Sequence, residues 1–286
     1  MKRIYLFVLF SLVIFNAFSQ SNRFGKITDD QWMLNKCDFD STAKAIILFD
    51  VGDITIEGKE NPKNIDPECP LRVDYYSIVY TRNLRIKILC KIDSLKFSFP
   101  LRSNEGEKDF LKSFKALSQR QENGDIIKTK YSQKTLEKIT DEMNSYTMVL
   151  DLSGEKEGSV IDINYILGSN TFTELPLWSF SNDFPTIYSE ISYSVPDFFD
   201  ISKTSPVFNE LNKETNILDY KYRVTYELAN GSSDKVYSYK YINEKYFLKN
   251  VLTSRKIKEP YKLKYIIKGI NTNSVSNKAE TWRFVH

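Results

Sequence analysis

The stretch "LWSFSNDFPTIYSEISYSVPDFF", Leu177–Phe199, combines many aromatic residues with two prolines. From Ile187 to Val195 its odd positions are mostly apolar, and most of the even positions between them are polar. Alternation with a period of two is typical of a strand with one buried face. Pro185 and Pro196 bound the alternation, as expected of residues that cannot donate to a sheet ladder. The stretch therefore predicts a strand between the two prolines, with most of its aromatic density in a core.

Three aromatic residues, Trp178, Phe180 and Phe184, come before this strand, at or near its turn. If they are exposed, they form an aromatic contact surface that could stack on a sugar or a peptide. The alternative is a packed corner, because aromatic side chains dominate the energetics of protein cores. The packed corner is the favoured interpretation of the two, and the contact surface stays as the alternative.

The same alternation recurs along the chain. It is found at 84–90, 95–101, 161–167, 220–228 and 261–267. Each segment predicts a half-buried strand, with the lysines and arginines between the apolar positions on a solvated face. The run "AIILFD", Ala45–Asp50, is apolar up to its last residue and predicts a strand covered on both faces.

Turn signals separate these segments. Asn123-Gly124 suits a type I′ hairpin, because both central residues need a positive φ. Asp50–Asp53, "DVGD", is a second hairpin candidate, and 132–144 could form one short helix capped by Ser132. Many short strands and few helices predict an all-β fold, an antiparallel β-sandwich of two layered sheets with at most one or two short helices.

The N-terminus has the layout of a secretory signal peptide over residues 1–19. Lys2 and Arg3 precede an apolar run that is too short to span a bilayer, and small residues stand before a cleavage site between Ser19 and Gln20. An uncleaved membrane anchor is the alternative. We therefore expect a periplasmic, extracellular or cell-surface protein with no membrane span after cleavage.

The rest of the chain divides into a β-sandwich domain at 20–204 and a Tyr/Lys-rich segment at 205–286. The second segment either continues the sandwich or forms a small β domain of its own. The formal net charge of the whole chain is +3. A chain so close to neutral does not predict nucleic-acid binding, which needs a basic patch or stripe.

The three cysteines, Cys37, Cys69 and Cys90, permit one disulfide in an oxidising compartment, and the sequence does not choose the pair. Cys90 extends an apolar alternation and is interpreted as a buried small hydrophobe. The three are too widely spaced to suggest a zinc site.

Residues for catalysis are scarce. The one histidine of the chain, His286, is its last residue, so a Cys-His or Ser-His-Asp arrangement has no well-positioned base. No cofactor fingerprint is present. Carboxylates such as Asp50, Asp53 and Glu57 could form an acid–base pair or a calcium site, but an ordinary acidic turn explains them as well. We therefore predict no catalytic, cofactor-binding or metal-binding residue.

Five stretches, in order along the chain, resemble a known family. They are "AKAIILFDVGD", "RNLRIKIL", "NGDIIKTK", "EGSVIDINYIL" and "LPLWSFSNDFPTIYSEISYSVPDFF", between Ala43 and Phe199. The family is the bacterial extracytoplasmic domain of unknown function that precedes a transglutaminase-like domain, mainly in Gram-negative bacteria. The resemblance implies a β-rich module without known catalytic residues. In that family a papain-type domain with a Cys-His-Asp arrangement follows, about where this chain ends.

These observations favour a secreted, non-catalytic β-sandwich module that serves a transglutaminase-like protein, either as a stand-alone version or as a severed N-terminal part. Its expected partner is a protein or peptide, or a transglutaminase-like domain. Two alternatives stay open. Aromatic residues make up 14% of the chain, which could serve a carbohydrate-binding module, and a hydrolase could operate with carboxylates alone.

Overall fold

The computed structural model describes most of the chain from Arg23 to Ile270. The described ranges are 23–58, 76–104, 107–140, 145–170, 175–206, 208–228, 231–257 and 261–270. The predicted signal peptide with its cleavage site at Ser19 and Gln20, as well as Cys69 and His286, lies outside these ranges.

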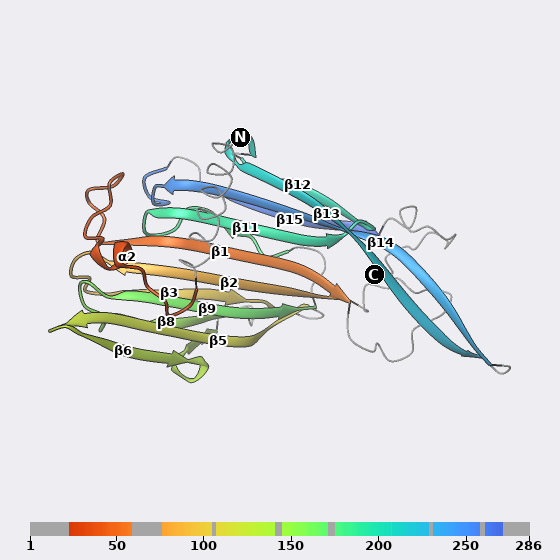
Figure 1. The fold of residues 1–286 in the computed structure, drawn as a ribbon, viewed down its shortest axis with the longest axis horizontal. Coiled ribbons are helices and arrows are strands. Elements are labelled where there is room, and N and C mark those ends of the chain that lie inside the picture. Colours follow the sequence, from red (N-terminus) through yellow and green to blue (C-terminus); the bar gives the residue numbers. More distant parts are fainter. Residues whose placement is uncertain are drawn as a thin grey trace, which may run out of the picture.

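Nine strands form one large sheet (Figure 1). Its neighbours run in the order β13-β14-β11-β1-β2-β9-β5-β4, and β6 also pairs with β5. The strands are β1 (Ala45–Gly58), β2 (Tyr76–Ile88), β4 (Ser103–Asn104), β5 (Glu107–Glu122), β6 (Asp125–Ser132), β9 (Val160–Ser169), β11 (Thr186–Pro196), β13 (Asn212–Leu228) and β14 (Gly231–Val251). The hairpin of β13 and β14 extends well beyond the other strands.

Two smaller sheets form the second layer. One has the order β3-β8-β7 and the other β10-β15-β12. Their strands are β3 (Lys96–Leu101), β7 (Glu137–Thr140), β8 (Tyr146–Asp151), β10 (Trp178–Ser179), β12 (Phe199–Thr204) and β15 (Lys262–Ile270). One continuous hydrophobic cluster joins side chains of both small sheets to the large sheet, for example Phe99, Leu263 and Ile163. The predicted all-β sandwich is confirmed, with the second layer split in two.

Helical segments are short. The structure contains α2 (Asp29–Met33) and the 3-10 turns η2 (Gln133–Thr135) and η3 (Phe208–Glu210) within the described ranges. The helix predicted for 132–144 is wrong over its described part, 132–140, where only η2 is helical and β7 follows it. Residues 141–144 lie outside the described ranges. Pairing with β8 makes residues 137–140 a strand, since β7 is aligned with β8 along its whole length.

The strand predicted between Pro185 and Pro196 is confirmed as β11, and it joins the two halves of the chain. It pairs antiparallel with β14 on one side and parallel with β1 on the other. The large sheet is therefore mixed rather than purely antiparallel. Because β14 lies in the large sheet, and β15 pairs with β10 and β12, the segment after residue 204 shares its sheets with the preceding one.

In the first half of the chain, one of two predicted hairpins is confirmed, and so is the predicted buried run. The Asn123-Gly124 hairpin is confirmed, with φ of 52° and 89° at its two central residues. The run Ala45–Asp50 is buried throughout, as predicted. The hairpin predicted at Asp50–Asp53 is wrong, because β1 continues without interruption to Gly58.

The outer face of β2 and β9 is covered, which the sequence did not indicate. The N-terminal segment lies over it, and Arg85 is fully buried there. Its guanidinium donates to Asp162 at 2.6 Å and to the Gln31 side chain at 2.7 Å, while Lys87 Nζ donates to the Trp32 carbonyl. The prediction that these cations lie on a solvated face is wrong, because the segment supplies acceptors for them.

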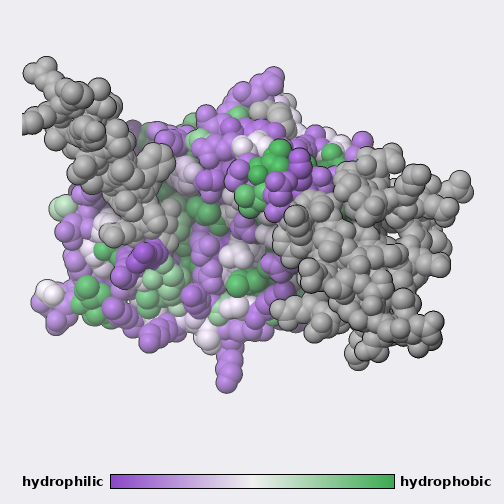
Figure 2. Space-filling view, turned by 45° about the vertical axis from the view of Figure 1, so that its right-hand side comes forward, coloured by the Kyte–Doolittle hydropathy of each residue, from purple (hydrophilic) through white to green (hydrophobic). Residues whose placement is uncertain are grey.

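Figure 2 shows one side of the surface, where small hydrophobic areas are separated by hydrophilic side chains. The exposed large hydrophobic residues of the described ranges include Ile126 and Ile127 on β6 and Leu177 just before β10. Within the described ranges, no helix has the length and apolar composition that crossing a membrane requires.

Gly52 gives a direct test of how the two layers meet. A Cβ at this position would lie 2.5 Å from the Trp178 ring and 2.6 Å from Ile191. We expect Gly52→Ala to lower the free energy of unfolding by about 1–3 kcal/mol, as overpacking does. Urea denaturation followed by tryptophan fluorescence measures the change.

Gly154→Ala is the matched control, because no atom lies within 4 Å of a Cβ added there. Its effect should stay within about 0.5 kcal/mol. Equal stabilities of the two variants would contradict the close packing of Trp178 on β1.

Candidate functional site

The predicted aromatic contact surface is largely absent. Trp178 and Phe180 are 1% and 0% exposed, and their rings make an edge contact with each other in the core. Trp178 is buried because Gly52 on β1 leaves room for its ring. Phe184 is partly buried and lines a cavity. The exposed Trp-Phe pair is therefore not found, and the packed corner, the interpretation that the sequence favoured, is the arrangement present.

The acidic candidates on β1 do not come together. Asp50 is buried, whereas Asp53 and Glu57 are exposed, as alternation along a strand requires for positions of opposite parity. Asp53 accepts a hydrogen bond from Thr55 instead. Within the described ranges, no group of three or more His, Cys, Asp or Glu side chains is placed to hold a metal ion.

Asp50 belongs instead to a buried ion pair. Arg82 on the neighbouring strand β2 donates from Nε at 2.7 Å and from Nη2 at 2.6 Å to its two carboxylate oxygens. Asn182 Nδ2 donates to the same carboxylate at 3.1 Å. A buried carboxylate needs such partners, because an unpaired charge in a protein interior is costly.

Arg82 also reaches both small sheets. Its Cζ lies 5.9 Å from the ring centroid of Phe97 on β3 and 5.0 Å from that of Trp178 on β10. These are cation–π distances. Arg82 therefore lies at the boundary between the two small sheets, near one ring of each. We call this boundary the seam, with residues 92–102 on one side and 175–185 on the other.

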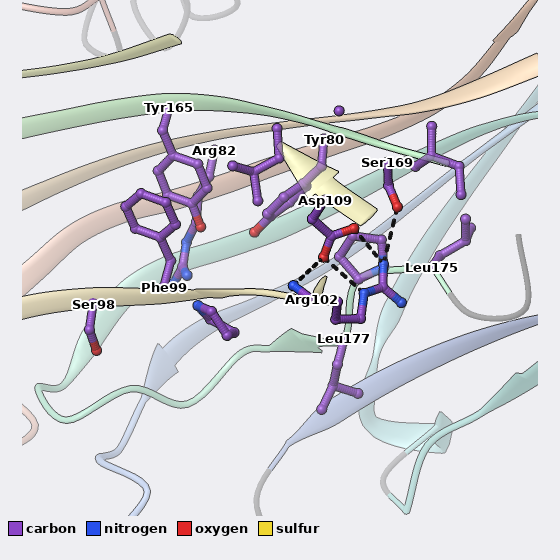
Figure 3. Close-up of a pocket in the computed structure, with 15 residues that line it drawn as sticks. Tyr80, Arg82, Ser98, Phe99, Arg102, Asp109, Tyr165, Ser169, Leu175 and Leu177 are labelled. Carbon is purple, nitrogen blue, oxygen red and sulfur yellow. Dashed lines mark hydrogen bonds and ion pairs between the residues drawn. The ribbon is translucent and has the colours of Figure 1, made fainter. Parts of the chain in front are cut away.

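A cavity of about 360 Å³ opens at one end of the seam (Figure 3). Its volume falls in the range of ligand pockets. Residues of β3 form one wall and the segment before β10 forms another, above a floor from β2 and β9. The lining is mainly apolar and aromatic and includes Tyr80, Phe99, Tyr165, Leu167, Leu175, Pro176 and Leu177. We call it the apolar cavity.

The walls of the apolar cavity are held in place by two contacts. The Phe99 and Tyr165 rings stack with centroids 4.3 Å apart. On the other side, Arg102 binds both carboxylate oxygens of Asp109, at 2.9 and 3.1 Å, and its Nη2 reaches Ser169. Leu177 is 53% exposed at the rim. A fixed apolar hollow with polar groups at its edge suits an apolar side chain.

Strand β3 offers an unpaired edge beside this cavity. It pairs only with β8 within the described ranges. The Leu152 N–H donates to the Leu95 carbonyl, so odd-numbered residues of β3 bond to β8 and even-numbered ones point away. Pro100 agrees with this, since proline in a sheet occurs at edges. The backbone N–H groups of Lys96 and Ser98 therefore point away from β8, and Ser98 lines the apolar cavity together with Leu175, Pro176 and Leu177.

A second polar cluster surrounds Glu244 on β14. Burial alone would raise the pKa of Glu244, but hydrogen bonds from Lys203, Lys213 and Tyr265 outweigh it and lower this pKa to about 2. Lys213 Nζ lies 2.7 Å from one carboxylate oxygen and the Tyr265 hydroxyl 2.5 Å from the other. Tyr246 also donates, at 3.2 Å. Through both carboxylate oxygens, Glu244 links β14 to Lys213 of β13 and to Tyr265 of β15.

The thiols are only partly as predicted. Cys37 and Cys90 are both free, and burial raises the pKa of Cys37. Cys90 is half-buried rather than buried, because β2 ends at Ile88 and the apolar alternation does not continue as a strand. Cys69, the third cysteine, lies outside the described residues.

Comparisons with known proteins add little. No family model matches the sequence, and no curated protein matches it. Among solved structures, the chain is similar to a protein of Parabacteroides distasonis ATCC 8503 described as a "putative protease", with a TM-score of 0.45 and 12% identity. The match covers 79% of this chain and 41% of that protein, so the chain spans less than half of its length. A likeness of this size carries no argument about function.

The ion pair below the seam can be tested by removing one partner. Arg82→Met leaves the Asp50 carboxylate buried without its cation, and we expect it to lower the free energy of unfolding by about 3–5 kcal/mol. The double variant Asp50→Asn/Arg82→Met should lose less free energy of unfolding than Arg82→Met, because no unpaired charge remains buried. Urea denaturation of both variants measures this. A double variant that is the less stable of the two would contradict the role assigned to the pair.

Proposed function

We propose that this chain is a non-catalytic module that binds an extended segment of a protein along the seam. The observation that carries the proposal is the unpaired edge of β3 beside the apolar cavity. An extended peptide can add a strand to a free sheet edge, with affinity from main-chain hydrogen bonds and specificity from pockets for alternate side chains. The N–H groups of Lys96 and Ser98 would donate the main-chain hydrogen bonds, and the apolar cavity would be the pocket for a side chain.

A peptide ligand is favoured over a glycan and over hydrolysis. Carbohydrate binding was suggested by exposed aromatic rings, but Trp178 and Phe180 are buried. A carboxylate-only hydrolase was suggested by the acidic residues of β1, but Asp50 is ion-paired and the others point to the opposite face. The non-catalytic assignment is also supported by the sequence, whose single histidine is His286.

The family resemblance supports the biological setting of this proposal. A module of that family would be secreted to the periplasm or cell surface and would work beside a transglutaminase-like domain. A segment of such a domain, or of a protein on which it acts, is the partner class that we propose.

Removal of one backbone N–H, that of Ser98, should block strand addition. In Ser98→Pro the N–H that points away from β8 is lost, while the hydrogen bonds of β3 to β8 are kept. Nonapeptides selected from a phage-displayed random library on the full chain should bind Ser98→Pro at least about tenfold more weakly, since proline on an edge strand blocks pairing. Fluorescence anisotropy with the selected peptides measures the affinity, and a thermal melt checks the fold.

Lys128→Pro on β6 is the matched control. β6 pairs only with β5 within the described ranges, and the two-residue turn makes Glu122 and Asp125 a hydrogen-bonded pair, so the N–H of Lys128 also points away from its neighbour. Binding that is lost in Lys128→Pro and kept in Ser98→Pro would place the peptide on β6 and refute the proposal.

A further inference from the structure

A second cavity, of about 470 Å³, lies at the other end of the seam. The same two segments that border the apolar cavity also border this one. Residues of 92–96, which lead into β3, form one wall, and Asp183, Phe184 and Pro185 form the opposite wall. The N-terminal segment and the residues after β14 complete it. An extended peptide along β3 would therefore pass both cavities.

The second cavity carries an excess of positive charge. Its charged lining residues are Lys44, Lys96, Arg255 and Lys256 against Asp40 and Asp183. Lys256 is engaged, since its Nζ donates to Asp40 at 2.7 Å and to Thr42 at 2.8 Å. Lys44 and Arg255 are exposed and form no salt bridge within the described residues. We call this the basic cavity.

Lys96, the first residue of β3, adds positive charge to the basic cavity. It lies opposite Asp151 on β8, and its charge lowers the pKa of that carboxyl after the larger effect of the hydrogen bonds from Ser153. Ile92 and Leu95 provide apolar surface on the same wall. Such a lining can pack the methylene groups of a side chain while its charged end meets the cations.

The spacing along residues 94–100, which lead into β3 and form most of it, relates the two cavities. Ser98, Phe99 and Pro100 line the apolar cavity, and Ser94, Leu95 and Lys96 line the basic one, four positions earlier. At about 3.3 Å per residue this is roughly 13 Å. In a strand, residues four positions apart point to the same face. A peptide paired with β3 could thus place one side chain in each cavity.

We propose that the basic cavity is a carboxylate subsite, and that the seam selects an acidic extended peptide. The peptide carries an apolar residue for the apolar cavity and an Asp or Glu four positions away for the basic cavity. This inference rests on the proposed function and deepens it by naming the ligand. Complementary charge at a solvent-exposed rim gives selectivity and faster association more than raw affinity.

The test is the composition of the peptides selected from the random nonapeptide library. Among peptides whose binding is lost in Ser98→Pro, we expect enrichment of an apolar residue and an acidic residue four positions apart. Replacing that acidic residue by Gln should weaken binding about fivefold, as for an ion pair at a partly exposed site. Raising the salt concentration should reduce the difference.

Variants of the protein test the contribution of the basic cavity separately from that of the apolar cavity. In Lys44→Gln/Arg255→Gln, most of the preference for the acidic peptide over its Gln counterpart should be lost, while the preference for the apolar residue stays. Lys128→Gln/Lys130→Gln on the exposed strand β6 removes the same charge elsewhere and should leave the acidic preference intact.

The outcomes distinguish the two proposals. Selection that yields no peptides sensitive to Ser98→Pro overturns the proposed function and this inference with it. Peptides that are sensitive to Ser98→Pro but show no acidic preference keep the proposed function and overturn the carboxylate subsite. Binding of heparin that needs Lys44 and Arg255, in the absence of any peptide preference, would overturn it in favour of a polyanionic glycan.

Discussion

The buried carboxylate of Asp50 is the constraint on which the candidate site depends. It lies in the middle of an apolar strand and is paired with Arg82 of the next strand. Because the guanidinium is bound to that carboxylate, it stays within cation–π distance of both the Phe97 and the Trp178 rings. These rings belong to the two separate small sheets. The ion pair thus fixes where the second layer of the sandwich divides.

The division of this layer gives the molecule features that a continuous sheet would lack. A single six-stranded second layer would have paired the edge of β3 and filled the space beside it. In the structure, that edge is open to the seam, with the apolar cavity at one end and the basic cavity at the other. Natural sheets restrict such edges, and Pro100 does so here by removing one donor. The remaining donors at Lys96 and Ser98 leave room for one extended partner.

Much of the fold follows from local patterns, and the site does not. The alternation at 95–101, 161–167 and between Pro185 and Pro196 predicted strands because burial of one face imposes a period of two. The seam depends on contacts such as Asp50 with Arg82, 32 positions apart, which no local pattern encodes.

Two signals in the sequence could have indicated part of the site. A carboxylate that ends the apolar run Ala45–Asp50 indicates a buried charge in need of a partner. Pro100 inside an alternating segment indicates an edge strand.

Amide hydrogen exchange, resolved by residue with NMR, tests most directly the central claim that a peptide adds a strand to β3. In the free protein the Ser98 amide should exchange fast while Phe97 and Phe99 are protected, and a saturating selected peptide should slow Ser98 at least about tenfold. A Ser98 amide whose exchange is unchanged by the bound peptide would contradict strand addition at the seam.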